Sequence, residues 1–171
     1  MTIRRQYLLP NCNLIVEGLS SQDESAADRP LLAIAINVEC HFQGRQQILS
    51  GGKAFIQNLT AAASAYAQEY LSGLPRSQEP QTEEDRVQIQ PREGRHCLIW
   101  QPGSKGQAQP VEIELATMEL FDLVEAIDQL AADRQTLPDL QLSLEPLHRR
   151  HRRPEEPLTQ RAAPLAMAPP G

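Results

Sequence analysis

The stretch Leu32-Ala-Ile-Ala-Ile-Asn-Val-Glu-Cys-His-Phe42 decides the fold. Every second residue of this stretch, counted from its first leucine, is apolar, which predicts a strand with one face buried along its whole length. The intervening residues are apolar at first and become polar at Asn37, Glu39 and His41, which predicts that the other face becomes exposed to water. A long strand buried on one face is typical of an antiparallel sheet.

Further candidate strands and a helix surround this stretch. The segments Ile3–Leu9 and Cys12–Leu19 alternate in the same way before it, and Gln46–Leu49 is a short candidate strand after it. A helix is then predicted to begin at Ser50-Gly51-Gly52 and to end at Gly73, because apolar residues recur at three- and four-residue steps between them.

The second half of the chain follows a similar plan. Val87–Ile89, Cys97–Trp100 and Val111–Leu115 are predicted strands. Thr117 is a suitable N-cap for a second amphipathic helix, which Pro138 ends. Apolar residues then alternate once more from 140 to 145, which predicts a closing strand.

These patterns predict an α+β fold, in which an antiparallel sheet carries two amphipathic helices packed on one face. The globular domain is expected over residues 1–147, with halves 1–74 and 86–147 and a polar linker at 75–85. A pseudo-twofold repeat of a β-β-β-α unit and a chance likeness within one antiparallel domain both stay open. So does the choice between one continuous sheet and two small packed units.

Composition sets the broad class of the protein. The chain has 171 residues, and its 40% of apolar residues suffice for a core, but only 4% are aromatic, so an aliphatic core is expected. No apolar run is long enough to cross a membrane, and no secretory signal peptide is expected. Cys12, Cys40 and Cys97 lack a CxxC spacing, which indicates free thiols in a reducing compartment.

Charge is unevenly placed along the chain. Residues 1–147 carry 11 Lys and Arg against 20 Asp and Glu, a net charge of −9, which makes this body a poor candidate for nonspecific binding to nucleic acid. Residues 148–171 are predicted to form a disordered tail that is first basic and then rich in Pro and Ala. Its basic run is either a solvated linker or a patch for nucleic acid or anionic lipid. The four arginines of that run are Arg149, Arg150, Arg152 and Arg153.

No motif for catalysis or for cofactor binding emerges. Gly51-Gly52-Lys53 fails as a phosphate-binding loop, because position 47 is Gln and Ala54 follows the lysine. Cys40-His41 and His96-Cys97 do not form a zinc site, because neighbouring strand residues point to opposite faces. The protein is therefore expected not to be an enzyme, with no catalytic, metal-binding or cofactor-binding residues and no cofactor.

The candidate binding residues lie on surfaces that the predicted core does not use. Arg4 and Arg5 are either a device that protects an edge strand from aggregation or part of a ligand site. The open sheet face is expected to present Glu112 and Glu114 as well as the polar residues of the long strand. The candidates for partner binding are thus Arg4, Arg5, Asn37, Glu39, His41 and the four arginines of the basic run.

The opening Ile3-Arg-Arg-Gln-Tyr-Leu-Leu-Pro-Asn-Cys-Asn-Leu-Ile-Val-Glu-Gly-Leu19, together with the long strand and the helix after Gly51-Gly52, resembles a cyanobacterial domain family of unknown function. The resemblance covers about residues 1–147, and its specific part is the opening stretch. It implies a cytosolic or membrane-peripheral protein of an oxygenic phototroph. It supplies neither an activity nor site residues.

Together these observations predict a non-enzymatic module for protein interaction, assembly or regulation, with a protein partner. By association with the resemblance, the partner is expected among photosynthetic membrane complexes, and the location is cytoplasmic or peripheral at the thylakoid membrane. One alternative is a nucleic-acid-associated factor that uses the basic run. Another is a small-ligand-binding protein with a cavity between sheet and helices.

Overall fold

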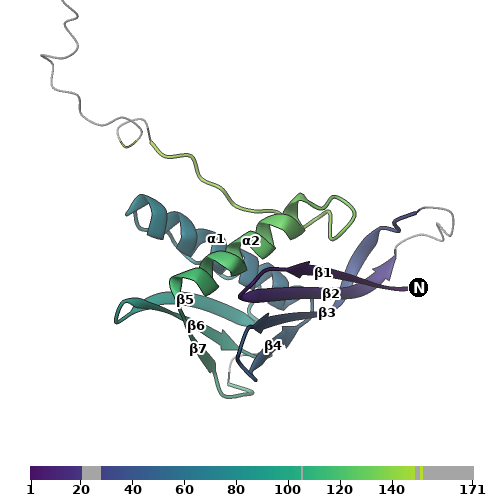
Figure 1. The fold of residues 1–171 in the computed structure, drawn as a ribbon, viewed down its shortest axis with the longest axis horizontal. Coiled ribbons are helices and arrows are strands. Elements are labelled where there is room, and N and C mark those ends of the chain that lie inside the picture. The colour runs from purple at the N-terminus through teal and green to yellow at the C-terminus, as the bar shows by residue number, and fades with distance from the viewer. Residues whose placement is uncertain (21–27, 105, 149–150, 152–171) are drawn as a thin grey trace, which may run out of the picture.

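A computed structural model describes residues 1–20, 28–104, 106–148 and 151. The chain forms two antiparallel sheets, with strand orders β1-β2-β3-β4 and β5-β6-β7, and both helices lie on the same side of the two sheets (Figure 1). The elements are β1 (Thr2–Leu8), β2 (Cys12–Ser20), β3 (Leu32–Phe42), β4 (Ile48–Gly51), α1 (Lys53–Ser72), β5 (Arg86–Arg92), β6 (Arg95–Gln101), β7 (Val111–Leu115) and α2 (Thr117–Ala132). The predicted α+β class is confirmed, and the two halves form separate sheets.

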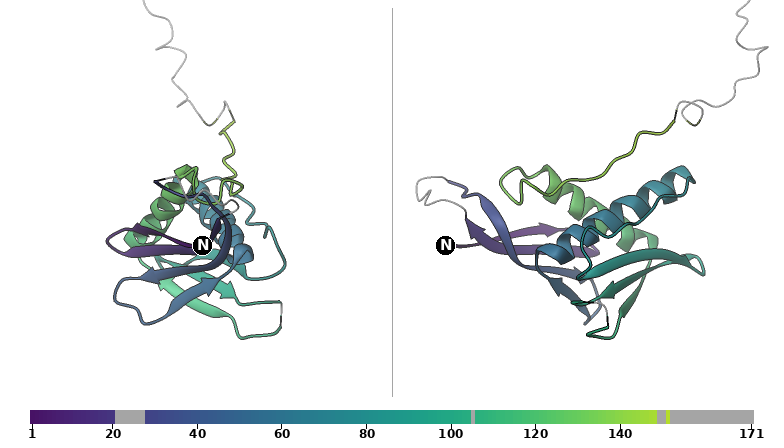
Figure 2. Two further views of the ribbon diagram at one scale, coloured as in Figure 1. Left: turned by 90° about the vertical axis from the view of Figure 1, so that its right-hand side faces the viewer. Right: turned by 180° about the vertical axis from the view of Figure 1, so that it is seen from behind.

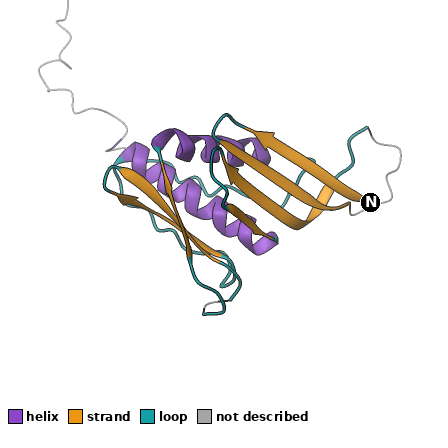
Figure 3. Ribbon diagram, turned by 60° about the horizontal axis from the view of Figure 1, so that its bottom comes forward, coloured by secondary structure: helices purple, strands orange, loops and turns teal. Residues whose placement is uncertain are grey.

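Each helix packs mainly on the sheet of the other half. α1 follows the first sheet in the chain but contacts β5 more than any other element, and α2 follows the second sheet but contacts β2 more than any other element. Figure 2 and Figure 3 show the two helices side by side, with the two sheets diverging from each other. One apolar core therefore contains residues from both sheets and both helices.

The prediction that every second residue of β3 is buried is wrong at two positions. Ile34 and Ile36 are 55% and 54% exposed, whereas Val38, Cys40 and Phe42 are buried as predicted. The cause is a break in the pairing of β2 with β3. Glu17 pairs with Asn37 and Gly18 with Ala35, so Ile36 has no partner on β2 and the alternation reverses there.

Gly18 allows this change of register. A Cβ atom at Gly18 would clash with the carbonyl oxygen of Ile34 and would lie 2.9 Å from Cδ2 of Leu32. Only a residue without a side chain lets the two backbones approach so closely.

The sequence predicted the end of α1 correctly but placed the start of α2 one residue too late. α1 ends as predicted at Gly73, which adopts the left-handed conformation at φ 70° and donates its N–H to the Glu69 carbonyl oxygen at 2.8 Å. The predicted N-cap of α2 is one residue late, because Ala116 occupies that position. Glu119 accepts the Ala116 N–H at 2.7 Å, and the Thr117 hydroxyl instead contacts His96.

The predicted closing strand does not form. Residues 139–147, called the strap here, run along α1 without strand pairing, although Leu140 and Leu142 pack against the core. The side-chain amide of Gln68 binds the strap backbone in place of a strand, donating to Ser143 O at 3.0 Å and accepting from Glu145 N at 3.2 Å.

The segment between the halves contains no helix or strand, as predicted, but it is held firmly against α1. The buried Asn58 side chain donates to the carbonyl oxygen of Glu84 at 2.7 Å and accepts from the N–H of Gln81 at 2.7 Å. Gln78 pairs in the same way with the backbone of Ile89 in β5, at 2.7 and 2.8 Å. Side-chain amides thus bind the backbone of the strap (Gln68), of the segment between the halves (Asn58) and of the edge strand β5 (Gln78).

Candidate functional site

The helix-free side of the first sheet carries a cluster of polar side chains. Asn37, Glu39 and His41 project there from β3, as predicted. Glu39 accepts hydrogen bonds from Nε2 of His41 at 2.9 Å and from Nδ2 of Asn37 at 3.1 Å. The hydrogen bond from His41, and then that from Asn37, lower the pKa of Glu39 and so favour its ionised form.

An apolar strip lies beside this cluster. Leu19 of β2 pairs directly with Ile34, and Ile36 follows at the break in register. All three are substantially exposed, with Leu19 at 39%. The name "open face" is used below for this strip and the polar cluster together.

The structure separates the two predicted arginines of β1. Arg4 belongs to the open face, where it pairs with Glu17 at 3.5 Å and both side chains are partly exposed. Arg5 points to the opposite side of the strand and donates through Nη2 to Pro30 O at 2.7 Å. Its Nε is buried and has no partner among the described residues, so Arg5 is a structural residue of the helix side and not part of the open face.

The other predicted candidates lie elsewhere. Glu112 and Glu114 belong to β7 in the second sheet, where Glu112 accepts from Arg92 at 2.8 Å, so they do not border the open face. Arg149, Arg150, Arg152 and Arg153 lie outside the described residues. The predicted disordered tail likewise falls mostly outside them.

His96 is a buried polar residue whose role the sequence did not reveal. Its Nδ1 lies 2.8 Å from the Tyr66 hydroxyl of α1, and its Nε2 lies 3.0 Å from the Thr117 hydroxyl of α2. Burial lowers the pKa of His96. Because both ring nitrogens are used within the fold, the residue joins β6 to the two helices and is not available to a ligand.

The three cysteines are buried free thiols, as the sequence predicted. Sγ of Cys12 lies 3.8 Å from Sγ of Cys40, and this contact, followed by burial, raises the pKa of Cys40. A protonated buried thiol is a poor nucleophile and a poor metal ligand. Within the described ranges there is no group of three or more His, Cys, Asp or Glu placed to hold a metal ion.

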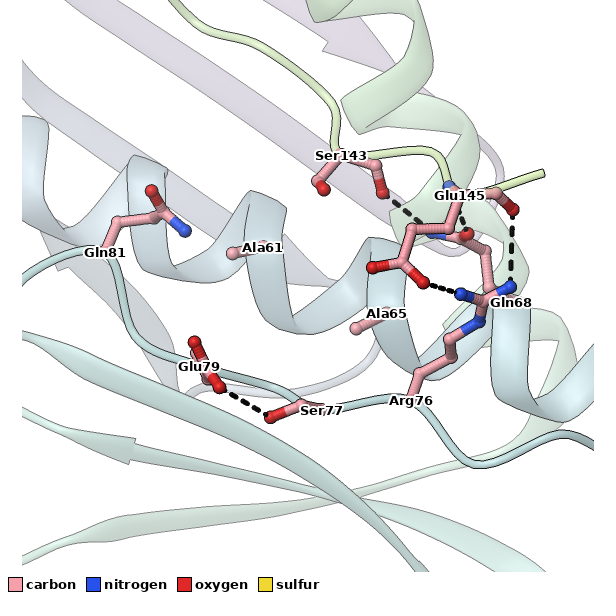
Figure 4. Close-up of a pocket in the computed structure, with 9 residues that line it drawn as sticks. All are labelled: Ala61, Ala65, Gln68, Arg76, Ser77, Glu79, Gln81, Ser143 and Glu145. Atoms are coloured by element: carbon pink, nitrogen blue, oxygen red, sulfur yellow. Dashed lines mark hydrogen bonds and ion pairs between the residues drawn. The ribbon is translucent and has the colours of Figure 1, made fainter.

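A groove runs along α1, between the strap and the segment that follows the helix (Figure 4). Two adjoining cavities of about 230 and 380 Å³ share Ala61, Gln81 and Ser143 in their walls, and a smaller one continues to Lys53. Ala61 and Ala65 lie on the helix side. At one end Arg76 forms an ion pair with Glu145. This α1 groove was not predicted, because its walls are irregular segments.

The two surfaces define the class of protein. It is a two-sheet α+β protein whose described residues form an open sheet face and a polar groove along α1. Neither helix in the described part combines the length and apolar character needed to span a bilayer.

The chain belongs to the family described as "Domain of unknown function (DUF4335)", which matches residues 5–169. No curated protein and no solved structure matches it. The resemblance to a domain family of unknown function is thus confirmed, and the cyanobacterial origin stays a prediction.

Proposed function

We propose that the protein is a non-enzymatic interaction module that docks a protein partner on its open face. The observation that supports this most strongly is the outward turn of Ile34 and Ile36. A sequence pattern that would bury both side chains is reversed by the register break beside Gly18, so two large apolar side chains lie on a sheet face that no other described segment covers. Contiguous exposed apolar side chains bordered by polar ones are typical of docking surfaces.

The chemistry of the open face indicates the kind of partner. Its charged groups are Arg4, Glu17 and Glu39, and residues 1–147 carry a net charge of −9. A complementary partner surface has an apolar centre bordered by Lys or Arg. Opposite charge speeds the encounter, and the apolar strip supplies most of the binding free energy.

The experiment compares affinity capture from the source organism by wild type and by the double variant Ile34→Ser, Ile36→Ser. Both variant positions are already half exposed, so we expect the fold to tolerate them. The double variant should retain at most about one tenth of the principal partner, identified by mass spectrometry, because anchor residues each contribute more than about 1 kcal/mol.

A matched control replaces exposed apolar residues of the helices, Leu71→Ser and Met118→Ser, which are 72% and 66% exposed. This control should capture as much partner as wild type. Equal capture by the open-face variant and wild type would contradict the proposal.

The proposed setting is the cytoplasmic side of photosynthetic membranes, where the module would serve assembly or regulation of a complex. The support is the resemblance of residues 1–147 alone. Cell fractionation tests it: the protein should sediment with thylakoids and be released by salt, and recovery wholly in the soluble fraction would contradict this setting.

A further inference from the structure

We propose that the α1 groove binds an extended segment of a protein partner that carries Lys or Arg, and that it holds this segment mainly by its backbone. The groove lies along α1 between the strap and residues 76–81 (Figure 4). It is a second site, separate from the open face, which lies on the opposite side of the first sheet from α1.

Both walls of the groove are pieces of chain with unpaired backbone groups. On the strap, the N–H and C=O groups of Gln141 form no hydrogen bond with a described residue, and on the other wall the same holds for Ser77 and Glu79. Neither of these two described segments is a strand of a sheet. Unpaired backbone of this kind is what an added strand from a partner pairs with.

Side-chain amides in the groove supply further partners for a peptide backbone. Gln68 shows how they act, since its amide donates to Ser143 O and accepts from Glu145 N. Gln57 and Gln81 line the same groove, and their amides form no hydrogen bond with a described residue. Each of them can therefore donate to one carbonyl group and accept from one N–H group of a bound peptide.

The helix side of the groove consists of small side chains. Ala61 and Ala65 lie there, and their methyl groups leave room for a peptide backbone close to α1. From Gln57 to Gln68 the helix rises about 16 Å, which about five residues of an extended peptide span. The groove therefore suits a short segment of a partner.

The charges in the groove favour a basic segment. The two larger cavities are lined by Glu79, Asp139 and Glu145 and by a single basic residue, Arg76. Arg76 pairs with Glu145, whereas Glu79 and Asp139 form no ion pair with a described residue. Lys53 shares the small end cavity with Asp139, so it offsets the acidic charge at that end only. A Lys or Arg of the peptide is therefore expected beside Glu79.

The groove suits a reversible contact. Among the described residues, no aromatic side chain lines the two larger cavities, so the usual anchors of tight interfaces are missing. Hydrogen bonds to the peptide backbone then carry the binding, and display of a peptide in several copies makes a weak contact of this kind detectable.

Phage that display random dodecapeptides in several copies are the probe. They are selected on the full-length protein and depleted on the Ala61→Arg variant, in which a long side chain fills the groove. We expect the enriched peptides to contain more Lys and Arg than the library. A synthetic peptide of the enriched sequence should bind Ala61→Arg at least about fivefold more weakly than wild type, measured by fluorescence anisotropy.

Two controls locate the binding site. Ala131→Arg is the same change at a comparably exposed alanine of α2, and it should leave the affinity for the peptide unchanged. The open-face variant Ile34→Ser, Ile36→Ser should also bind the peptide as wild type does. Failure of this site and failure of the open face as a docking surface are thereby distinguished.

Two further measurements test the chemistry of recognition. Glu79→Gln with Asp139→Asn should weaken binding and make it less sensitive to salt, because the charges that attract the peptide are removed. N-methylation of single peptide amides should weaken binding at two or more positions, because each methyl group removes a backbone donor.

Four results would overturn the proposal. They are the absence of an enriched sequence, enrichment of acidic peptides, equal affinity of wild type and Ala61→Arg, and loss of binding in the open-face variant. If Ala61→Arg fails to fold by circular dichroism, Gln57→Ala with Gln81→Ala replaces it, and the same fivefold weakening is required.

Discussion

At the scale of single residues, Gly18 lies where β2 and β3 approach most closely. Its missing side chain admits the Ile34 carbonyl group, and the register break beside it places Ile34 and Ile36 outside. A glycine within a strand pattern is a known sign of such a close approach. It was the one signal in the sequence that could have revealed the reversal.

Gly18→Ala is expected to destabilise the protein by about 1–3 kcal/mol, because the methyl group overlaps backbone atoms that cannot move freely. Urea unfolding measures this loss. Gly52→Ala, where the nearest atom lies 3.6 Å from the new Cβ, should cost less. Equal losses for the two variants would show that the close approach at Gly18 is not a constraint.

His96 gives the protein a pH-dependent stability. Because burial lowers its pKa in the folded state, the unfolded chain takes up the proton first as the pH falls below about 6.5. Neutral His96 therefore contributes fully to the free energy of unfolding above that pH, and this contribution is lost as the pH falls towards the pKa of His96 in the folded state. We expect the free energy of unfolding to decrease between pH 7.5 and 5.5, measured about every half unit. His96→Asn should show a shallower decrease, and an identical slope would contradict this assignment.

At the scale of elements, the strap shows that a segment can alternate between apolar and polar residues without forming a strand. Leu140 and Leu142 alternate with polar residues and are half buried, but the strap runs along a helix and not along a sheet edge. The Gln68 amide takes over the role of the partner strand. Alternation predicts which side chains are buried, but it does not predict what pairs with the backbone.

Gln68→Ala should release the strap. We expect amide hydrogen exchange at Glu145 to accelerate and stability to fall by about 1 kcal/mol, because one side chain holds two backbone groups. Gln57→Ala, a change at the other end of the groove where no described partner is lost, should leave Glu145 exchange unchanged. Unchanged exchange in Gln68→Ala would show that other contacts hold the strap.

At the scale of the whole molecule, the exchange of helices between sheets makes one folding unit. α1, from the first half, packs on β5 of the second sheet, and α2, from the second half, packs on β2 of the first sheet. Each sheet is therefore covered more by the helix of the other half than by its own. Two probes should therefore report the same urea midpoint. They are Trp100 fluorescence for the second sheet, and pulsed thiol labelling of Cys12 and Cys40, located by mass spectrometry, for the first. Separate midpoints would indicate independent halves.

Periodicity predicted the class, both helices and seven strands, because burial of one face leaves a regular pattern. The division into two sheets and the crossing of the helices depend on contacts between distant segments, which a single sequence does not display. For the open face, Arg4, Asn37, Glu39 and His41 were predicted correctly as surface residues. Its apolar strip was missed, because the register break reverses the pattern.

The most direct test of the open face as a docking surface uses a photo-crosslinking amino acid at Ile36 in living cells of the source organism. The same residue at Met118, on α2, serves as the control position. We predict one discrete protein adduct from Ile36 that Leu19→Lys abolishes, and no such adduct from Met118. An absence of adducts from Ile36, or the same adducts from both positions, would contradict the account.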